Sequence, residues 1–194
     1  MSGTRDFKKE KEVKFLVSDV HSILEKVQSV GKYSRTEYIR DTIMGTGNTR
    51  DKKIRLRVKH NFQNSSVEAT FKFKVGEDGG VKTEIEDTVY KGCSVADALK
   101  LIKNYGAYKE ENSYEKIRSV YESNDVEIVL DVYPFGVWIE IEGEPECIWE
   151  TAKALGLKKE NAITQNADEL YLEWQKAHAV PEQWDVRFGL GGKK

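Results

Sequence analysis

Hydrophobic and polar residues alternate along several stretches of this 194-residue chain. Successive side chains of a β-strand point to opposite faces, so this alternation predicts strands with one apolar and one polar face. In the first stretch Val13, Phe15 and Val17 share the apolar face. About eight strands are expected, at residues 10–17, 35–43, 53–59, 70–75 and 82–86, within 107–123, and at 126–133 and 137–142. The turn between the fourth and fifth is expected at 76–80.

Four other stretches repeat apolar residues at helical spacing, which predicts amphipathic helices. They begin after Ser18 (the expected N-cap), at Ser94, at Pro145, and at Asn166 or Asp168. No internal repeat and no long linker divides the chain. We therefore expect one α+β domain over residues 1–180, followed by a C-terminal tail over 181–194.

The apolar stripes of the helices need a partner surface, and the apolar face of the sheet is the economical one. An open sheet would leave the polar face in water, whereas a closed sheet would turn it into the lining of a tunnel. The alternation alone leaves both arrangements open. The polar face carries Glu10, Glu12, Lys14, Arg55, Arg57, Lys72, Lys74, Lys82, Glu84, Glu86, Lys116, Arg118, Asp131, Glu140 and Glu142.

A tunnel lined with both signs of charge is costly unless the charges pair or bind a ligand. Arginine and lysine side chains bind phosphate oxygens, and carboxylates bind Mg²⁺ or Mn²⁺. The polar face therefore favours a polyanion held together with a divalent cation.

Composition excludes several other classes of function. With 31 basic and 33 acidic residues the net charge is −2, which is not the charge of a general nucleic-acid binder. Cys93 and Cys147 lie far apart and the three histidines are scattered, so no zinc site is expected. Without an apolar signal sequence or a stretch of about 20 apolar residues, we expect a cytoplasmic protein with neither membrane nor nucleic acid as a partner.

Seven short motifs follow one another in the order found in the CYTH domain, the family of triphosphate tunnel metalloenzymes, and the chain resembles that family over roughly residues 8–175. They are Glu-x-Glu-x-Lys at 10–14, Tyr-x-x-Asp at 38–41, Ile-Arg-Leu-Arg at 54–57, Thr-Phe-Lys at 70–72, a basic-then-acidic strand at 80–86, Lys-Ile-Arg at 116–118, and Leu-Asp at 130–131 followed by Gly-x-x-x-Glu-x-Glu at 136–142.

The resemblance implies an eight-stranded antiparallel closed β-barrel with a charged lumen and helices packed outside. It implies metal binding, by Mg²⁺ or Mn²⁺, at Glu10, Glu12, Asp131, Glu140 and Glu142. Substrate binding is expected at Lys14, Arg55, Arg57, Lys72, Lys74, Lys82, Lys116 and Arg118, where either Lys72 or Lys74 takes the place of the family lysine.

The family includes inorganic and thiamine triphosphatases and class IV adenylate cyclases. We expect a metal-dependent hydrolase acting on tripolyphosphate, ATP or thiamine triphosphate, with Lys14, Tyr38 and Lys82 as catalytic residues and with Tyr38 and Lys82 as a proton-handling pair. The alternatives are cyclisation of ATP to cyclic AMP and diphosphate, and a non-catalytic polyphosphate-binding module. A homodimer is compatible with the resemblance.

Two features bear on the organic part of the substrate. The family's Ser-Tyr pair before the last helix is not evident at residues 163–167, so specificity stays open. Trp184, Arg187 and Phe188 would either close one mouth of the tunnel against a base or belong to a tail without fixed structure.

Overall fold

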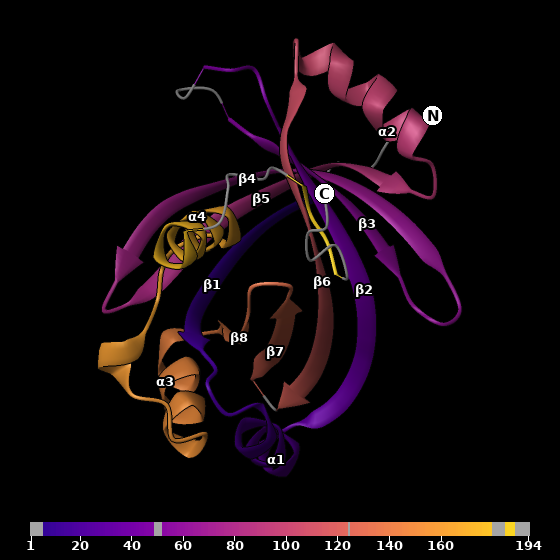
Figure 1. Ribbon diagram of the computed structural model, residues 1–194. Helices are drawn as coiled ribbons and strands as arrows, with labels where there is room; N and C mark the ends of the chain where they lie inside the picture. Colours follow the sequence, from indigo (N-terminus) through magenta and orange to yellow (C-terminus); the bar gives the residue numbers. More distant parts are fainter. Residues whose placement is uncertain (1–5, 49–51, 124, 180–184, 189–194) are drawn as a thin grey trace.

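Eight antiparallel strands form a closed barrel in the computed structural model, which describes residues 6–48, 52–123, 125–179 and 185–188 (Figure 1). The order β2-β3-β4-β5-β1-β8-β7-β6 is closed by pairing of β2 with β6. This confirms the closed barrel with helices outside, and the open-sheet alternative is wrong. The strands are β1 (Asp6–Leu16), β2 (Lys32–Gly45), β3 (Ile54–His60), β4 (Ser65–Asp78), β5 (Val81–Gly92), β6 (Lys109–Ser123), β7 (Val126–Tyr133) and β8 (Gly136–Gly143).

Strand β1 changes its partner along its length. Its first part pairs with β5, up to Glu12 opposite Lys82, and its last part pairs with β8, from Glu12 opposite Glu142. Strand β6 pairs with β2 almost throughout, but with β7 only over its second half. Beside its first half lies β9 (Asp185–Val186), which pairs in parallel with β6 at Ser113 and Tyr114. Part of the predicted tail thus extends the sheet.

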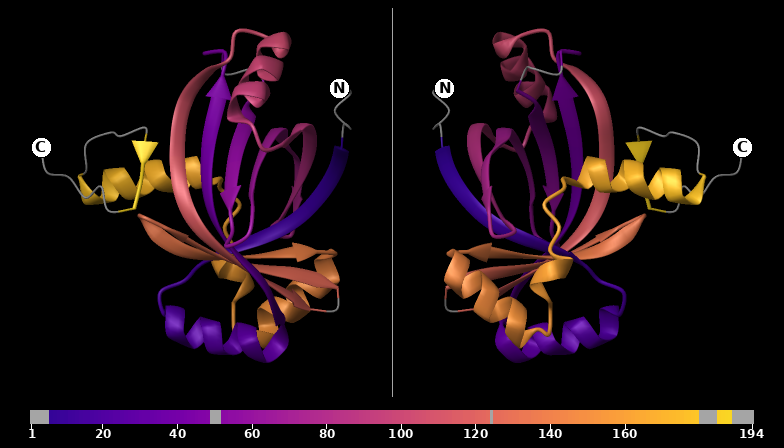
Figure 2. Two further views of the ribbon diagram at one scale, coloured as in Figure 1. Left: turned by 90° about the vertical axis from the view of Figure 1, so that its right-hand side faces the viewer. Right: turned by 90° about the vertical axis from the view of Figure 1, so that its left-hand side faces the viewer.

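Helices cover the barrel at two opposite ends (Figure 2). Helices α1 (Val20–Val30) and α3 (Pro145–Ala154) pack on one end, where Val27 and Ile148 are buried with Phe15 of β1. Helix α2 (Val95–Ile102) packs on the other end against β3 and β4. The apolar faces of the strands therefore point outward to the helices, and the polar faces point into the barrel.

Two local predictions need correction. The N-cap of α1 is Asp19 and not Ser18: the Asp19 carboxylate accepts from the backbone N–H of Ser22 at 3.0 Å, because the helix begins at Val20. Strand β4 continues to Asp78, beyond the expected start of the turn. Only Gly79 and Gly80 form the turn, with φ angles of +57° and +87° that suit a tight hairpin.

Helix α4 (Ala167–His178) lies across the barrel beside the β7–β8 hairpin (Figure 1). Asn166 and Glu169 form a capping box at its start. The ring centroids of Tyr171 and Phe135 lie 4.9 Å apart, within a buried aromatic cluster that also contains Trp138. The short 3₁₀ helices η1 (Lys103–Tyr105) and η2 (Lys159–Asn161) complete the helical elements of the described residues.

Within the described ranges, none of the helices has both the length and the apolar character required to cross a membrane.

Candidate functional site: a charged cavity inside the barrel

The lumen contains a cavity of about 350 Å³ whose wall is built almost wholly from charged side chains. All eight barrel strands contribute to it, and the start of α4 adds Asn166, Ala167 and Asp168. Because each strand presents every second residue inward, the polar face expected from alternation is the face that lines this cavity.

Three carboxylates converge in the cavity. One oxygen from each of Glu12, Glu140 and Glu142 lies within 4.8 Å of the others. The strand register causes this, since Glu12 lies opposite Glu142 and Lys14 lies opposite Glu140 across the β1–β8 pair. Burial, together with the negative charges of Glu10, Glu140 and Glu12, raises the pKa of Glu142 to about 7, although Arg118 opposes the shift. The ionised form of Glu142 is therefore disfavoured in the folded protein.

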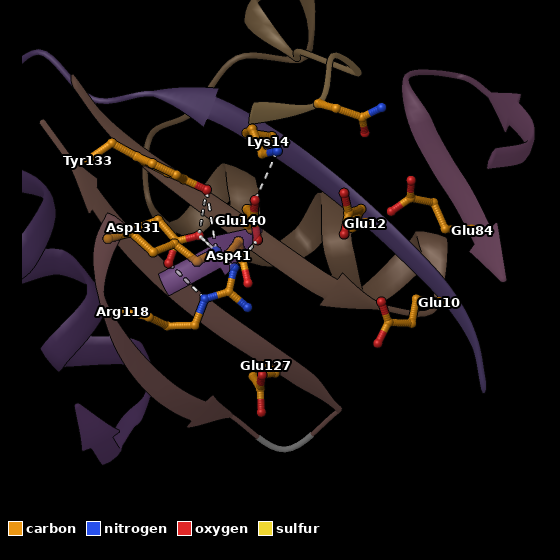
Figure 3. Close-up of polar contacts among 12 residues, drawn as sticks. Glu10, Glu12, Lys14, Asp41, Glu84, Arg118, Glu127, Asp131, Tyr133 and Glu140 are labelled. Carbon is orange, nitrogen blue, oxygen red and sulfur yellow. Dashed lines mark hydrogen bonds and ion pairs between the residues drawn. The ribbon is translucent and has the colours of Figure 1, made fainter. Parts of the chain in front are cut away.

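Cations contact two of these carboxylates, and Figure 3 shows the contact between Lys14 and Glu140. Glu140 accepts from the Lys14 ammonium at 2.9 Å and from the Arg118 guanidinium at 2.8 Å, and Lys82 lies 2.7 Å from Glu12. Burial alone would disfavour every one of these charges. The neighbouring cations nevertheless lower the pKa of Glu140 well below its usual value, and Glu140 and Glu12 raise that of Lys14.

The structure separates two predicted metal ligands from this group. Glu10 contacts Lys8 at 2.8 Å and lies 3.7 Å from Lys72. Asp131 is fully buried and accepts from Arg118 at 2.7 Å and from Lys116 at 2.8 Å. Figure 3 shows Asp131 beside Arg118, and Glu10 nearer the start of β1 than Glu12. Only Glu12, Glu140 and Glu142 of the five predicted ligands form one cluster.

A second basic group lies on β3 and β4. Arg55 contacts Glu86 at 2.9 Å, and its buried Nε has no hydrogen-bond partner among the described residues. Lys72 lies 2.6 Å from Glu84. Although burial favours a neutral amine, nearby carboxylates raise the pKa of Lys72 and keep it protonated. Lys74, by contrast, is 42% exposed and pairs with Glu77 at the rim, so Lys72 is the lysine inside the lumen.

Two buried aspartates hold the basic groups in position. Asp41 accepts from both Nε and Nη2 of Arg57 at 2.7 Å. Asp131 holds Arg118 and Lys116, and the Lys116 ammonium also donates to the Tyr133 hydroxyl at 3.3 Å. Burial and the positive charge of Arg118 lower the pKa of Lys116 to about 8, against the effect of Asp131.

The expected pairing of Tyr38 with Lys82 is not found. Tyr38 packs against His60, with ring centroids 6.0 Å apart, and does not line the cavity. Burial and a hydrogen bond to Glu115 raise its pKa to about 12. Tyr38 is three residues from the inward-facing Asp41, so strand alternation puts it on the outer face of β2.

Several cavity residues were not predicted as part of the site. Tyr133 lies two residues beyond Asp131 on a strand whose alternation was recognised, so extending the inward face by two residues would have found it. Asn166 accepts from Lys82 at 3.2 Å, but it comes from a helix start whose place over the barrel no local pattern predicts. Glu84 and Glu86 were expected on the polar face but were given no role in binding. The charged wall residues that were not predicted as site residues are Lys8, Arg35, Lys53, Lys59, Glu68, Lys91, Glu127 and Asp168.

The CYTH domain family model matches residues 8–181. The chain belongs to the CYTH domain family. A search of curated protein sequences gave no match.

Solved structures agree with this assignment. The PH1012 protein of Pyrococcus horikoshii OT3 matches at a TM-score of 0.66 with 26% identity, covering 83% of this chain and 98% of its own. The PH1819 protein of the same organism matches at 0.66 with 27% identity, covering 84% and 98%. A Vibrio parahaemolyticus protein described as a "putative adenylate cyclase" matches at 0.63 with 15% identity, covering 89% and 99%, and this likeness concerns the fold alone.

Proposed function

We propose that this CYTH-domain protein is a metal-dependent triphosphate hydrolase whose substrate lies in the lumen. The observation that carries the proposal is the cluster of Glu12, Glu140 and Glu142 inside a cavity that is otherwise rich in arginine and lysine. Carboxylates that converge beside cations match the two needs of phosphoryl transfer, which are a divalent cation and neutralisation of phosphate charge.

The cluster fits a divalent cation with oxygen ligands. Such ions bind carboxylates at roughly 2.0–2.6 Å, so ligand oxygens on opposite sides of one ion are about 4–5 Å apart. The spacing within 4.8 Å requires only small side-chain adjustments. Glu142 supplies the chemical reason, since burial and the neighbouring carboxylates Glu140 and Glu12 raise its pKa and so disfavour its charged form in the absence of a cation. A bound Mg²⁺ or Mn²⁺ would offset that charge and supply Lewis-acid stabilisation of the phosphate oxygens.

The residues of the chain supply binding and orientation. Arg55, Arg57, Lys72 and Arg118 would hold the phosphate oxygens, and the buried Nε of Arg55 offers a donor that no described residue uses. Asp41 and Asp131 fix the guanidinium groups before substrate arrives. Preorganised donors in a site with little water stabilise developing charge more strongly than mobile ones in solvent.

Lys14 and Lys82 remain proposed catalytic residues. Each contacts one carboxylate of the cluster, Lys14 through Glu140 and Lys82 through Glu12. Lys14 stays protonated because its pKa is raised, so it suits stabilisation of negative charge on a leaving phosphate and not removal of a proton from water. Lys82 is held by Glu12, Glu84 and Asn166, which gives it a fixed position.

Cyclisation of ATP to cyclic AMP and diphosphate is the alternative reaction. It would use the same lumen with a ribose hydroxyl as the nucleophile. The non-catalytic polyphosphate-binding module has less support, because a cation held by the carboxylate cluster would also supply the Lewis acid that cleavage needs.

Phosphate release from tripolyphosphate tests the proposal. We expect turnover with Mg²⁺ or Mn²⁺ and none in EDTA. Equal rates with and without metal, or tripolyphosphate that binds but is never cleaved, would contradict it. Thiamine triphosphate and ATP are the organic substrates to compare.

A further inference from the structure

A second cavity, of about 440 Å³, adjoins the lumen and plays no part in the proposed chemistry. It lies between the first half of β6, α4 and β9. Lys53, Tyr114 and Asp168 line both cavities, so the two are neighbours that share a wall. We name it the side cavity.

The fold creates the side cavity because β7 pairs with only the second half of β6. Beside the first half, the wall consists of β9 and α4 instead of a barrel strand. Val186 of β9 lines the cavity, and Asp185 fixes β9 to the barrel by accepting from Ser113 at 2.9 Å and from Arg40 at 3.2 Å.

The lining of the side cavity is more apolar than that of the lumen. The exposed surface of the lumen cavity is mostly polar, whereas that of the side cavity is mostly apolar, with Tyr114, Tyr171, Leu172 and Val186 among its residues. An apolar pocket with a few polar groups is typical of a site for an organic ligand. Triphosphate alone would gain nothing from it.

The polar groups of the side cavity favour a ligand that donates hydrogen bonds. The buried carboxamide oxygen of Asn112 has no hydrogen-bond partner among the described residues. The carboxylate of the half-buried Asp168 lines the same cavity and is a second acceptor. The ammonium of Lys53 is already paired with Glu111 at 3.1 Å. An unpaired buried acceptor is costly, and a ligand donor that reaches it removes that cost.

We propose that the side cavity binds the organic group of an organic triphosphate, and that this group is a planar heterocycle bearing an exocyclic amine. Tyr114 and Leu172 would contact the ring, and Asn112 would accept from the amine after rotation of its carboxamide. This inference rests on the proposed function, because the triphosphate must lie in the lumen for the heterocycle to reach the cavity.

Binding measured by calorimetry in EDTA tests the inference without interference from metal-dependent turnover. The probes are tripolyphosphate, ATP, and ITP, which has a carbonyl where ATP has its amine. We expect ATP to bind about tenfold more tightly than ITP. ATP would donate one buried hydrogen bond to Asn112, whereas the carbonyl of ITP would place an acceptor against an acceptor. Thiamine triphosphate carries an aminopyrimidine, so comparing its affinity with that of ATP shows whether the cavity prefers a pyrimidine or a purine.

Two variants probe different walls of the cavity. Asn112→Leu should abolish the preference for ATP over ITP, and Leu172→Trp should weaken ATP or thiamine triphosphate by filling the space. Both should leave tripolyphosphate affinity within about twofold of the wild type, because neither side chain lines the lumen. Val20→Trp, at a 39% exposed position on α1 outside both cavities, is the matched control for a bulky substitution.

The outcomes separate the two proposals. Equal affinities for ATP and ITP in the wild type, or organic triphosphates unaffected by Leu172→Trp, would overturn the side-cavity inference and leave the hydrolase proposal standing. Tripolyphosphate that binds without metal-dependent cleavage would overturn the hydrolase proposal, while an ATP preference removed by Asn112→Leu would still support the side cavity.

Discussion

The Asp41 carboxylate accepts two hydrogen bonds from the Arg57 guanidinium, both at 2.7 Å, in the wall of the lumen. Asp41 is fully buried and Arg57 is 8% exposed. Despite the cost of burial, Arg57 lowers the pKa of Asp41 and keeps it ionised. A bidentate pair of this kind fixes the plane of the guanidinium.

Asp41→Asn should therefore destabilise the protein, because it leaves a buried guanidinium without its counter-charge. We expect a loss of about 3–5 kcal/mol in the free energy of unfolding, measured with urea. The double variant Asp41→Asn, Arg57→Gln should recover part of that loss. If Asp41→Asn alone leaves stability unchanged, the pair does not hold Arg57 in place.

Glu12 and Glu10 provide a matched pair of substitutions on one face of β1. Glu12→Gln removes a member of the carboxylate cluster, and we expect turnover of tripolyphosphate to fall by about 100-fold or more, as for the loss of several kcal/mol of transition-state stabilisation. Glu10→Gln removes a carboxylate outside the cluster, and its turnover should fall less than about tenfold.

The same two variants should differ in their dependence on Mg²⁺. Glu12→Gln should require more metal for half-maximal rate, whereas Glu10→Gln should resemble the wild type. Thermal unfolding of both variants controls for loss of fold. Greater damage from Glu10→Gln than from Glu12→Gln would contradict the choice of Glu12, Glu140 and Glu142 as the metal ligands.

Lys72 and Lys74 provide a second matched pair, on β4. Lys72 lies in the lumen among Glu10, Glu84 and Glu86, whereas Lys74 lies at the rim. Lys72→Ala should weaken tripolyphosphate binding by more than about tenfold, the loss of a charge-assisted contact. Lys74→Ala should change it by no more than about twofold, because exposed ion pairs contribute little. Equal effects in a calorimetric titration would show that the rim lysine also binds phosphate.

The raised pKa of Glu142 should make the stability of the protein depend on pH. Its pKa is raised from 4.5 to about 7, so between these values the folded protein keeps a proton that the unfolded chain has released. The free energy of unfolding should therefore fall as pH rises through that window. In EDTA, the melting temperature of the wild type should fall from pH 5 to pH 7.5, and that of Glu142→Gln should fall less. Parallel profiles for the two proteins would contradict the raised pKa.

Strand alternation predicts which side chains face the lumen, but it does not predict which of them meet. Glu10 and Glu12 are equivalent in the sequence pattern. They separate in the structure because β1 passes from β5 to β8 at Glu12, which brings Glu12 opposite Glu142 and leaves Glu10 opposite Glu84. That switch of partner depends on the closure of the whole barrel and has no local signal.

The position of Tyr38 outside the lumen, in contrast, could have been predicted from the sequence. Residues three apart on a strand point to opposite faces, so an inward Asp41 requires an outward Tyr38. The side cavity, in contrast, depends on where α4 and β9 dock. Neither the helical spacing of α4 nor the composition of β9 indicates its neighbour across the barrel.

The products of ATP and tripolyphosphate turnover, resolved by phosphorus NMR with purified protein and Mg²⁺ or Mn²⁺, test the central claim most directly. We expect orthophosphate and diphosphate from tripolyphosphate, and hydrolysis of ATP without cyclic nucleotide. Cyclic AMP and diphosphate as the main products from ATP, or no cleavage of either compound, would contradict it.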